Sequence, residues 1–308
     1  MSLAAGRLGY RLRAFLGFSR AVQATLSIAQ PAFAAVIAVG GLPPFDRTAA
    51  GLLAAFAGFF AVFALNDLMD VDLDRARFEH LRGFQGFDID SAMARHPLAQ
   101  GQLGFNLGLV WVGGLALLGL AVAYVLSPIA ALLFVTAAVL EIGYCKLARV
   151  TELKYLVTGL MVGCGTLAGW AAVSVDLRAA EIAVLFVWMF AWEIGGRNIV
   201  NDFADVEEDV RLGIRSVAVV HGPEFASRLT FFFLLATAAS SLALQPLAHL
   251  GLSYLAFATV LGGYLLILPG LRLWRHPEPE NAMALFNRAS FYPPLMVAGL
   301  LSSQSLPF

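Results

Sequence analysis

Long apolar stretches separated by short polar segments are the main pattern of this chain. A helix needs about 20 mostly apolar residues to cross a lipid bilayer. The nine stretches that reach or approach that length cover residues 21–41, 48–66, 103–124, 128–146, 153–174, 181–200, 226–247, 252–271 and 287–304. The pattern predicts an all-α membrane protein with nine transmembrane helices. Pro31 lies inside the first stretch and Pro293 and Pro294 inside the last, where neighbouring helices can satisfy the carbonyls that proline leaves free.

Composition agrees with this prediction and limits the function classes. Of the 308 residues, 59% are hydrophobic and 13% are charged, whereas a soluble domain carries about 25% charged residues. The net charge is −1 and the sequence has no basic patch with interleaved aromatic residues, so no nucleic-acid partner is expected. Cys145 and Cys164 lie inside apolar stretches without metal-ligand spacing, which is typical of small core residues.

Lysine and arginine are distributed unevenly between the two ends of the predicted helices. Of the 20 such residues, 18 lie in the N-terminal segment or near the connections after the second, fourth, sixth and eighth stretches. Only Arg47 and Arg178 lie on the other side. Because cytoplasmic loops carry the excess of basic residues, the sequence predicts a multi-pass plasma (inner) membrane protein with a cytoplasmic N-terminus and an external C-terminus.

Two acidic clusters share the pattern N-D-x-x-D-V-[DE]-x-D. They read NDLMDVDLD at 66–74 and NDFADVEED at 201–209, and each follows an even-numbered stretch. The two clusters begin 135 positions apart. This repetition predicts one domain over 1–308 that is built from two related halves, about 1–146 and 147–308.

The spacing within each cluster indicates a cation site. On a helix, the first, second, fifth and ninth residues of the pattern span about 100° of one face. Several carboxylates on one face repel one another unless a cation neutralises them, and oxygen ligands suit Mg²⁺, with Mn²⁺ as an alternative. The candidate metal ligands are Asn66, Asp67, Asp70, Asp74, Asn201, Asp202, Asp205 and Asp209. Asp72 and Glu207 fall on the opposite face and are predicted to be solvated or paired.

Basic residues near both clusters point to an anionic ligand. Carboxylates, Mg²⁺ and converging arginine or lysine side chains form the grouping that holds a diphosphate. The candidates for this role are Arg75, Arg95, Lys146, Arg149 and Arg211. The excess of basic residues in cytoplasmic loops is an alternative explanation for them. Arg197 projects from nearly the same helix face as Asn201, so Arg197 and its neighbour Asn198 are predicted to line the pocket.

These segments resemble the UbiA-type superfamily of intramembrane prenyltransferases. The similarity rests on NDLMDVDLD, HPLAQGQL, YCKLAR and NDFADVEEDVRLGIRSVAVVHG, and it runs over nearly the whole chain. The resemblance implies nine transmembrane helices around a central cavity that is capped by cytoplasmic loops. It also implies Mg²⁺-dependent transfer of a prenyl group from a prenyl diphosphate to an acceptor within the membrane lipid. The acceptor is usually an aromatic ring, as in quinone biosynthesis.

The resemblance also assigns roles to individual residues. It implies that Asp70, Asp74, Asp205, Asp209 and Lys146 are catalytic, and that Tyr144 contacts the diphosphate together with Lys146, Arg149 and Arg75. The chain departs from the family pattern at Phe59, where members that prenylate 4-hydroxybenzoate carry arginine. Arg197 or Arg20 could supply the missing charge. His96, Cys145 and Ala148 also differ from the family pattern, and the segment after Asp74 is longer than expected.

Three functions remain open on the sequence alone. The first is transfer to a hydrophobic aromatic acceptor. The second keeps the scaffold but uses a non-aromatic acceptor, or cyclises the prenyl chain without any acceptor. The third is a cation transporter, because rings of carboxylates also occur in ion pathways. Metal-dependent release of diphosphate separates the enzymes from the transporter.

Overall fold

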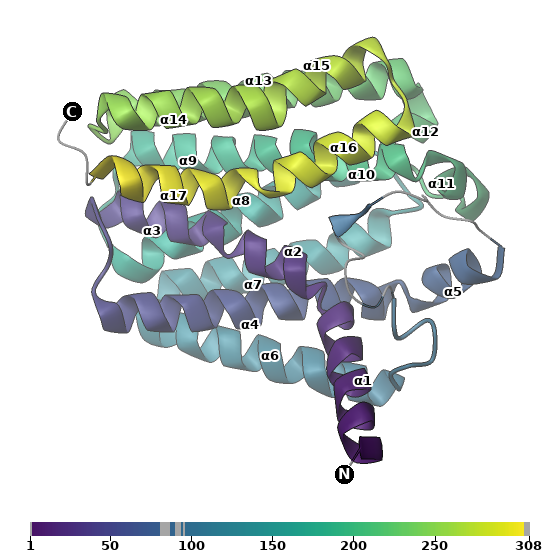
Figure 1. Ribbon diagram of the computed structural model, residues 1–308. Coiled ribbons are helices and arrows are strands. Elements are labelled where there is room, and N and C mark those ends of the chain that lie inside the picture. Colours follow the sequence, from purple (N-terminus) through teal and green to yellow (C-terminus); the bar gives the residue numbers. More distant parts are fainter. Residues whose placement is uncertain (1, 81–86, 90–93, 95, 305–308) are drawn as a thin grey trace.

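The computed structural model describes residues 2–80, 87–89, 94 and 96–304, and these residues form helices and no strand (Figure 1). The N-terminal half contains α1 (Ser2–Phe18), α2 (Ala21–Ser27), α3 (Ala29–Val39), α4 (Phe45–Met69), α5 (Val71–His80), α6 (Phe105–Leu126) and α7 (Pro128–Leu147). The C-terminal half contains α8 (Lys154–Val173), α9 (Ala179–Trp192), η2 (Glu193–Asn198), α10 (Ile199–Ala204), α11 (Val206–Leu212), α12 (Val217–His221), α13 (Pro223–Leu247), α14 (Leu252–Gly262), η3 (Gly263–Ile267), α15 (Leu268–Arg275), α16 (Pro279–Ser290) and α17 (Tyr292–Gln304).

Eight helical segments of the described chain are long and apolar enough to cross a membrane. They correspond to the first eight predicted stretches, which confirms an all-α membrane protein. The ninth stretch, 287–304, is divided at Phe291 between α16 and α17. Pro293 and Pro294 follow this division and remove two backbone donors, so neither helix reaches the length of a single span. The count of nine therefore stays a prediction.

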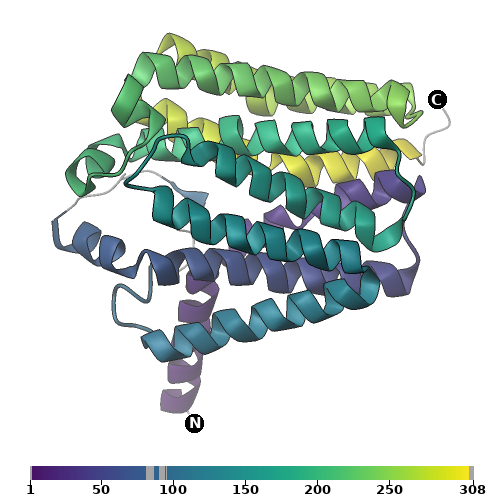
Figure 2. The same ribbon diagram turned by 180° about the vertical axis from the view of Figure 1, so that it is seen from behind.

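The long helices lie side by side, and α1 crosses their direction at one end (Figure 1). Seen from behind, α6 and α13 lie at opposite edges of the bundle (Figure 2). The largest hydrophobic core lies in the C-terminal half around Trp188, Trp192 and Tyr292, all at most 1% exposed. Their polar atoms are satisfied internally, because Trp188 Nε1 donates to the Tyr292 hydroxyl (3.3 Å) and Trp192 Nε1 donates to the Ala289 carbonyl (3.0 Å).

Both acidic clusters break their helices at the same position of the pattern. Asp70 separates α4 from α5 with φ −99° and ψ 11°, and Asp205 separates α10 from α11 with φ −100° and ψ 17°. Each amide still bonds the carbonyl of the cluster's asparagine, at 3.0 Å for Asp70 to Asn66 and 3.2 Å for Asp205 to Asn201. α5 and α11 project from the same end of the bundle (Figure 1). The matching backbone supports the proposal of two related halves.

Glycines of α8 allow its neighbours to approach closely. A side chain at Gly159 would meet Phe190 and Ile194, one at Gly163 would meet Phe186, and one at Gly169 would meet the backbone of Pro31. Nothing lies within 4 Å of the position of a Gly165 side chain. Small residues are used in membrane bundles for such contacts. Three of these four glycines of α8 therefore serve helix packing.

Arg47 and Arg178, at the end of the bundle away from the acidic clusters, have structural partners. Arg47 donates to the carbonyls of Leu126 (3.0 Å) and Ala172 (3.3 Å), near the ends of α6 and α8. Arg178 donates to Ile37 (2.9 Å) and Ala38 (2.7 Å) near the end of α3. The last carbonyls of a helix have no partner within the helix. These contacts give a physical reason for two arginines outside the basic end.

Candidate functional site

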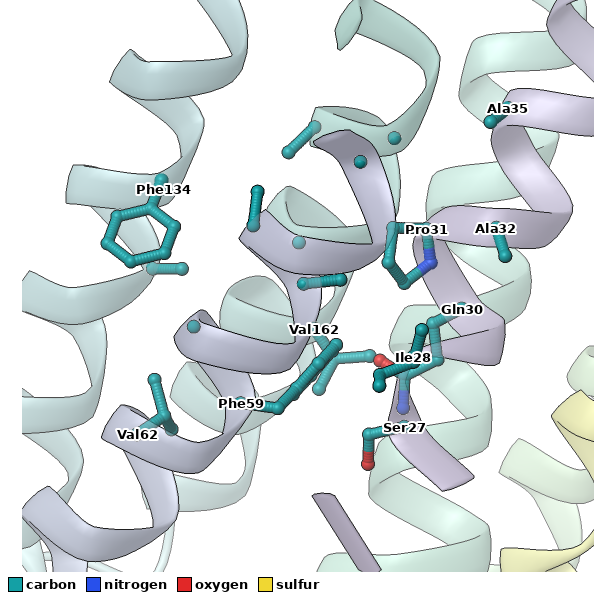
Figure 3. Close-up of a pocket in the computed structure, with 18 of the residues that line it drawn as sticks. Ser27, Ile28, Gln30, Pro31, Ala32, Ala35, Phe59, Val62, Phe134 and Val162 are labelled. Atoms are coloured by element: carbon teal, nitrogen blue, oxygen red, sulfur yellow. The ribbon is translucent and has the colours of Figure 1, made fainter. Parts of the chain in front are cut away.

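A cavity of about 450 Å³ lies between α3, α4, α7 and α8 (Figure 3). Its middle is lined by apolar side chains, among them Phe59, Val62, Phe134 and Val162, and by Pro31. Arg47 at one end and Asn66 at the other both line it, and the part of α4 between them is about 28 Å long at 1.5 Å per residue. The cavity is therefore long and mostly apolar, and it reaches an acidic cluster at one end.

The polar end of the cavity is built by both acidic clusters. Asn66 and Asn201, the first residue of each cluster, line the wall. Asn66 Oδ1 accepts from Arg20 (3.1 Å), and its Nδ2 donates to Glu141 (3.1 Å). Glu141 also lines the cavity although only 3% of it is exposed. The signal for Glu141 was a carboxylate inside an apolar stretch, and sequence reasoning missed it.

Asp67 and Asp74 converge on His96. The His96 Nδ1 atom lies 2.9 Å from Asp74 and 3.4 Å from Asp67, and Arg20 lies 3.1 Å from Asp67. Burial by itself would lower the pKa of His96, but the two carboxylates beside it raise the pKa above its usual value. His96 adopts φ 44° and Arg20 adopts φ 43°, so both basic groups are held here by left-handed backbone, which is uncommon outside glycine.

The corresponding aspartate of the second cluster has a different basic partner. Asp202 Oδ2 lies 2.8 Å from Lys154 Nζ, and Lys154 is 3% exposed. Lys154 Nζ also donates to the Tyr144 hydroxyl at 3.4 Å, and Asn198 Nδ2 donates to the same hydroxyl at 3.2 Å. Tyr144 and Asn198 line the cavity, and their contact with a substrate stays a prediction. Sequence reasoning counted Lys154 only toward orientation, because its contact with Asp202 is made in three dimensions.

A second pocket of about 290 Å³ lies beside the first cluster. It is lined by Met69, Asp70, Asp72, Leu73, Cys145, Lys146, Ala148 and Arg149. The structure thus brings Asp70 together with two of the predicted anion-binding residues, Lys146 and Arg149. Arg149 Nε donates to the Leu212 carbonyl at 3.1 Å, which links this loop to α11, the helix that contains the last residues of the second cluster.

Arg197 is buried and lines the cavity, as its helix face predicted. It donates to Ser290 Oγ at 2.7 Å, and its guanidinium lies 4.3 Å from the centre of the Phe286 ring. Glu193, one helical turn earlier, also lines the cavity. The π-helical turn η2 contains both residues, and such turns are frequent at functional sites.

Other candidates lie away from the cavity. Arg75 pairs with Asp72 at 3.2 Å, and the Asp72 side chain is 91% exposed, which confirms the prediction that Asp72 is a paired surface charge. Glu207 and Arg211 are exposed on α11, and Arg95 lies outside the described residues. Glu208, which sequence reasoning left out, is buried next to the buried Asp209. Both lie in α11, a helix of seven residues that is too short for its buried face to be read from the sequence.

Comparison with known proteins decides which fold family this arrangement represents. A family model described as the UbiA prenyltransferase family matches residues 28–292. The chain belongs to the UbiA prenyltransferase family. It is therefore a multi-pass integral membrane protein and a prenyltransferase, as the sequence resemblance implied.

Curated relatives in the UbiA family differ in their acceptors. A digeranylgeranylglyceryl phosphate synthase of Ignicoccus hospitalis is 30% identical over 82% of this chain and 80% of its own length. A 4-hydroxybenzoate solanesyltransferase of Synechocystis is 28% identical over 87% of each chain. A protoheme IX farnesyltransferase of Bordetella petrii is 28% identical over 97% of this chain and 96% of its own.

Solved structures agree with the fold. A UbiA homologue from Aeropyrum pernix superposes with a TM-score of 0.72 at 20% identity, over 91% of this chain and 98% of that chain. A UbiA homologue from Archaeoglobus fulgidus, which was solved with geranyl diphosphate and Mg²⁺, superposes with a TM-score of 0.64 at 18% identity, over 95% of this chain and 100% of its own. The Archaeoglobus fulgidus homologue thus binds a divalent ion together with a prenyl diphosphate.

The residues at the polar end have the chemistry that Mg²⁺ requires. Every candidate ligand offers a carboxylate or amide oxygen, which is the donor type of hard cations. Asp74 and Asp209 are 3% and 2% exposed, and buried carboxylates at membrane depth need neutralisation. Asp67, Asp74 and Asp202 have Arg20, His96 or Lys154 beside them, so bases of the chain balance part of the charge of both clusters.

Proposed function

We propose that this enzyme transfers a prenyl group from a prenyl diphosphate to an aromatic, quinone-precursor-like acceptor inside the membrane, with Mg²⁺ as the cofactor and Mn²⁺ as an alternative ion. The observation that carries the proposal is the cavity itself. Its long apolar wall suits an isoprenoid tail, and its polar end contains the asparagines of both acidic clusters.

The residues divide the work between metal and diphosphate. Asn66, Asp70 and Asp74 would hold Mg²⁺ from the first cluster, and Asn201, Asp205 and Asp209 from the second. When bound, Mg²⁺ supplies positive charge against the diphosphate oxygens. Lys146 and Arg149, beside Asp70 in the second pocket, bind the remaining oxygens by charge-assisted hydrogen bonds.

The chain's own groups then favour ionisation of the donor. As the bond between C1 and the diphosphate oxygen breaks, its electron pair leaves with the diphosphate and an allylic cation remains. Phe59 and Phe63 on the cavity wall stabilise this cation by their ring quadrupoles, and the apolar wall keeps water away from it. A ring carbon of the acceptor attacks C1, and the acceptor ring then loses a proton to an oxygen of the released diphosphate or of a cluster carboxylate.

Transfer to a non-aromatic acceptor is the second candidate. It is favoured by the similarity to the digeranylgeranylglyceryl phosphate synthase and by Phe59, which lines the cavity where benzoate-prenylating members carry arginine. Arg197 and Arg20, which also line the cavity, would take over the recognition of an anionic acceptor.

We place the enzyme in the plasma membrane with the acidic clusters on the cytoplasmic side, because most basic residues lie at that end.

Diphosphate release by the purified protein in lipid nanodiscs tests the proposal. Geranyl, farnesyl and geranylgeranyl diphosphates are offered with Mg²⁺, with Mn²⁺ or with a chelator, against phenolic, naphthoic, haem and glycerophosphate acceptors. We expect metal-dependent release together with a prenylated aromatic product by mass spectrometry. A prenylated glycerophosphate would favour the second candidate, and terpene products without acceptor would favour cyclisation. Absence of release with every donor, ion and acceptor would overturn the proposal.

A further inference from the structure

The buried ammonium of Lys154 lies behind the cavity wall and not on it. Lys154 does not line either pocket, and it is more buried than Lys146 and Arg149, which are both exposed and line the second pocket. Burying an ammonium is costly unless it is paired and hydrogen-bonded. Its partners are Asp202 at 2.8 Å and the Tyr144 hydroxyl at 3.4 Å. Lys154 can therefore act on a bound substrate through these two contacts.

The first half of the chain contains an ion pair that corresponds to the pair of Lys154 and Asp202 but lies differently relative to the cavity. Arg20 precedes α2 and holds Asp67 at 3.1 Å, as Lys154 begins α8 and holds Asp202 at 2.8 Å. In both halves a base before the first span thus neutralises the second residue of the acidic cluster. Arg20, however, lines the cavity and contacts Asn66 directly. In the second half, Tyr144 stands between the base and the cavity.

The hydrogen bonds at Tyr144 fix the direction of its proton. A phenol oxygen can accept hydrogen bonds and donate one. Lys154 Nζ is only a donor, and Asn198 Nδ2 donates to the same oxygen at 3.2 Å. Within the described part of the chain, the Tyr144 hydroxyl donates to no residue. Because Tyr144 lines the cavity near Asn201, its O–H group is left to donate to a ligand there.

We propose that Lys154 is a positioning residue, which aims the Tyr144 O–H group into the cavity so that it donates to the departing diphosphate. Lys154 does this while it neutralises Asp202, which leaves the remaining oxygens of the second cluster for the cation. The proposal rests on the proposed function. A buried charge pair that only tethers α8 to α10 is the competing explanation.

A double-mutant cycle separates positioning from tethering. Lys154→Met, Tyr144→Phe and the double variant are compared in nanodiscs for diphosphate release and for Mg²⁺-dependent binding of geranyl thiolodiphosphate, which cannot ionise at C1. Each single variant should lower kcat about 100- to 1,000-fold, the effect typical of one lost donor to developing charge, with the acceptor KM changed less than about 3-fold. The kcat of the double variant should be no lower than that of the less active single variant, because both substitutions remove the same hydrogen bond to the diphosphate.

Arg178→Met is the matched control, because Arg178 also ties two helices together but lies outside the cavity. It should lower the melting temperature and leave the kcat of the folded enzyme unchanged. Multiplicative effects of the Lys154 and Tyr144 variants would overturn the positioning role. So would full kcat in Tyr144→Phe, a result that does not depend on whether Lys154→Met folds. A wild-type enzyme that neither binds the analogue nor releases diphosphate would overturn the proposed function itself, and this inference with it.

Discussion

At the scale of single residues, corresponding positions of the two acidic clusters have corresponding structural environments. The asparagines line the cavity, the second residues are paired with bases, the fifth residues sit at helix breaks, and the ninth are buried. Asp70 and Asp72 are two positions apart, yet Asp70 lies at the end of α4 and Asp72 is a surface charge. Position relative to the helix break therefore decides the role of each carboxylate.

Asp70→Asn tests this division. The substitution keeps the size of the side chain and removes a charge from the proposed cation site, so diphosphate release should fall at least about 100-fold. Glu207→Gln is the control at the exposed position of the second cluster, and it should change release less than about 2-fold and the stability by less than about 0.5 kcal/mol. Release is measured at saturating Mg²⁺ with geranyl diphosphate. Equal losses in the two variants would contradict the assignment of Asp70.

The candidate residues of the clusters could be found from sequence because spacing and charge are local properties. The basic residues that pair with these carboxylates could not be found from the sequence. Lys154 is 48 positions before Asp202 and Arg20 is 47 before Asp67, and nothing in the sequence says which base meets which carboxylate. Glu141 shows the same limit, because its hydrogen bond to Asn66 joins two different helices.

At the scale of helices, close approach of backbones shapes the cavity wall. Pro31 lies on this wall, and its backbone packs on Gly169 where α3 meets α8. Three glycines of α8 contact residues of neighbouring helices, and Gly165 faces open space. The glycine spacing could be read from the sequence, but the identity of the helix against each glycine could not.

Gly169→Ala should therefore destabilise the protein strongly. The new methyl group meets the backbone of Pro31, which cannot move aside without displacing α3, so we expect a loss of several kcal/mol or failure to fold. Gly165→Ala is the matched control on the same helix and should melt at the wild-type temperature or slightly higher. Thermal unfolding in detergent, followed by size-exclusion chromatography, distinguishes the two. An unchanged melting temperature for Gly169→Ala would contradict the close contact.

At the scale of the whole molecule, the two ends of the bundle differ in charge. The acidic clusters and most basic residues lie at one end. At the other end, Arg47 and Arg178 bind helix carbonyls. The positive-inside rule predicts that the first end faces the cytoplasm. The arginines at the second end do not weaken this assignment, because their structural partners explain their presence.

Accessibility of single cysteines tests the orientation. In a chain whose two cysteines are replaced by alanine, Leu177→Cys, which is 85% exposed in the wild type at the second end, should react with a membrane-impermeant maleimide on intact cells. Glu152→Cys, in the connection between α7 and α8, should react only after permeabilisation. The reverse pattern would show that the topology is inverted. Labelling of both positions on intact cells would contradict a spanning α8.

The sequence by itself determined the class of fold and the position of eight spans, and it predicted the chemistry of the clusters, because hydrophobic length, charge bias and motif spacing are properties of neighbouring residues. It also indicated the family, since its motifs are local. Only the tertiary structure decided which base pairs with which carboxylate, which aromatic side chains line the cavity and where proline and aspartate divide the helices. Those outcomes depend on packing between helices far apart in the chain, where a buried charge must find whichever partner the fold brings to it.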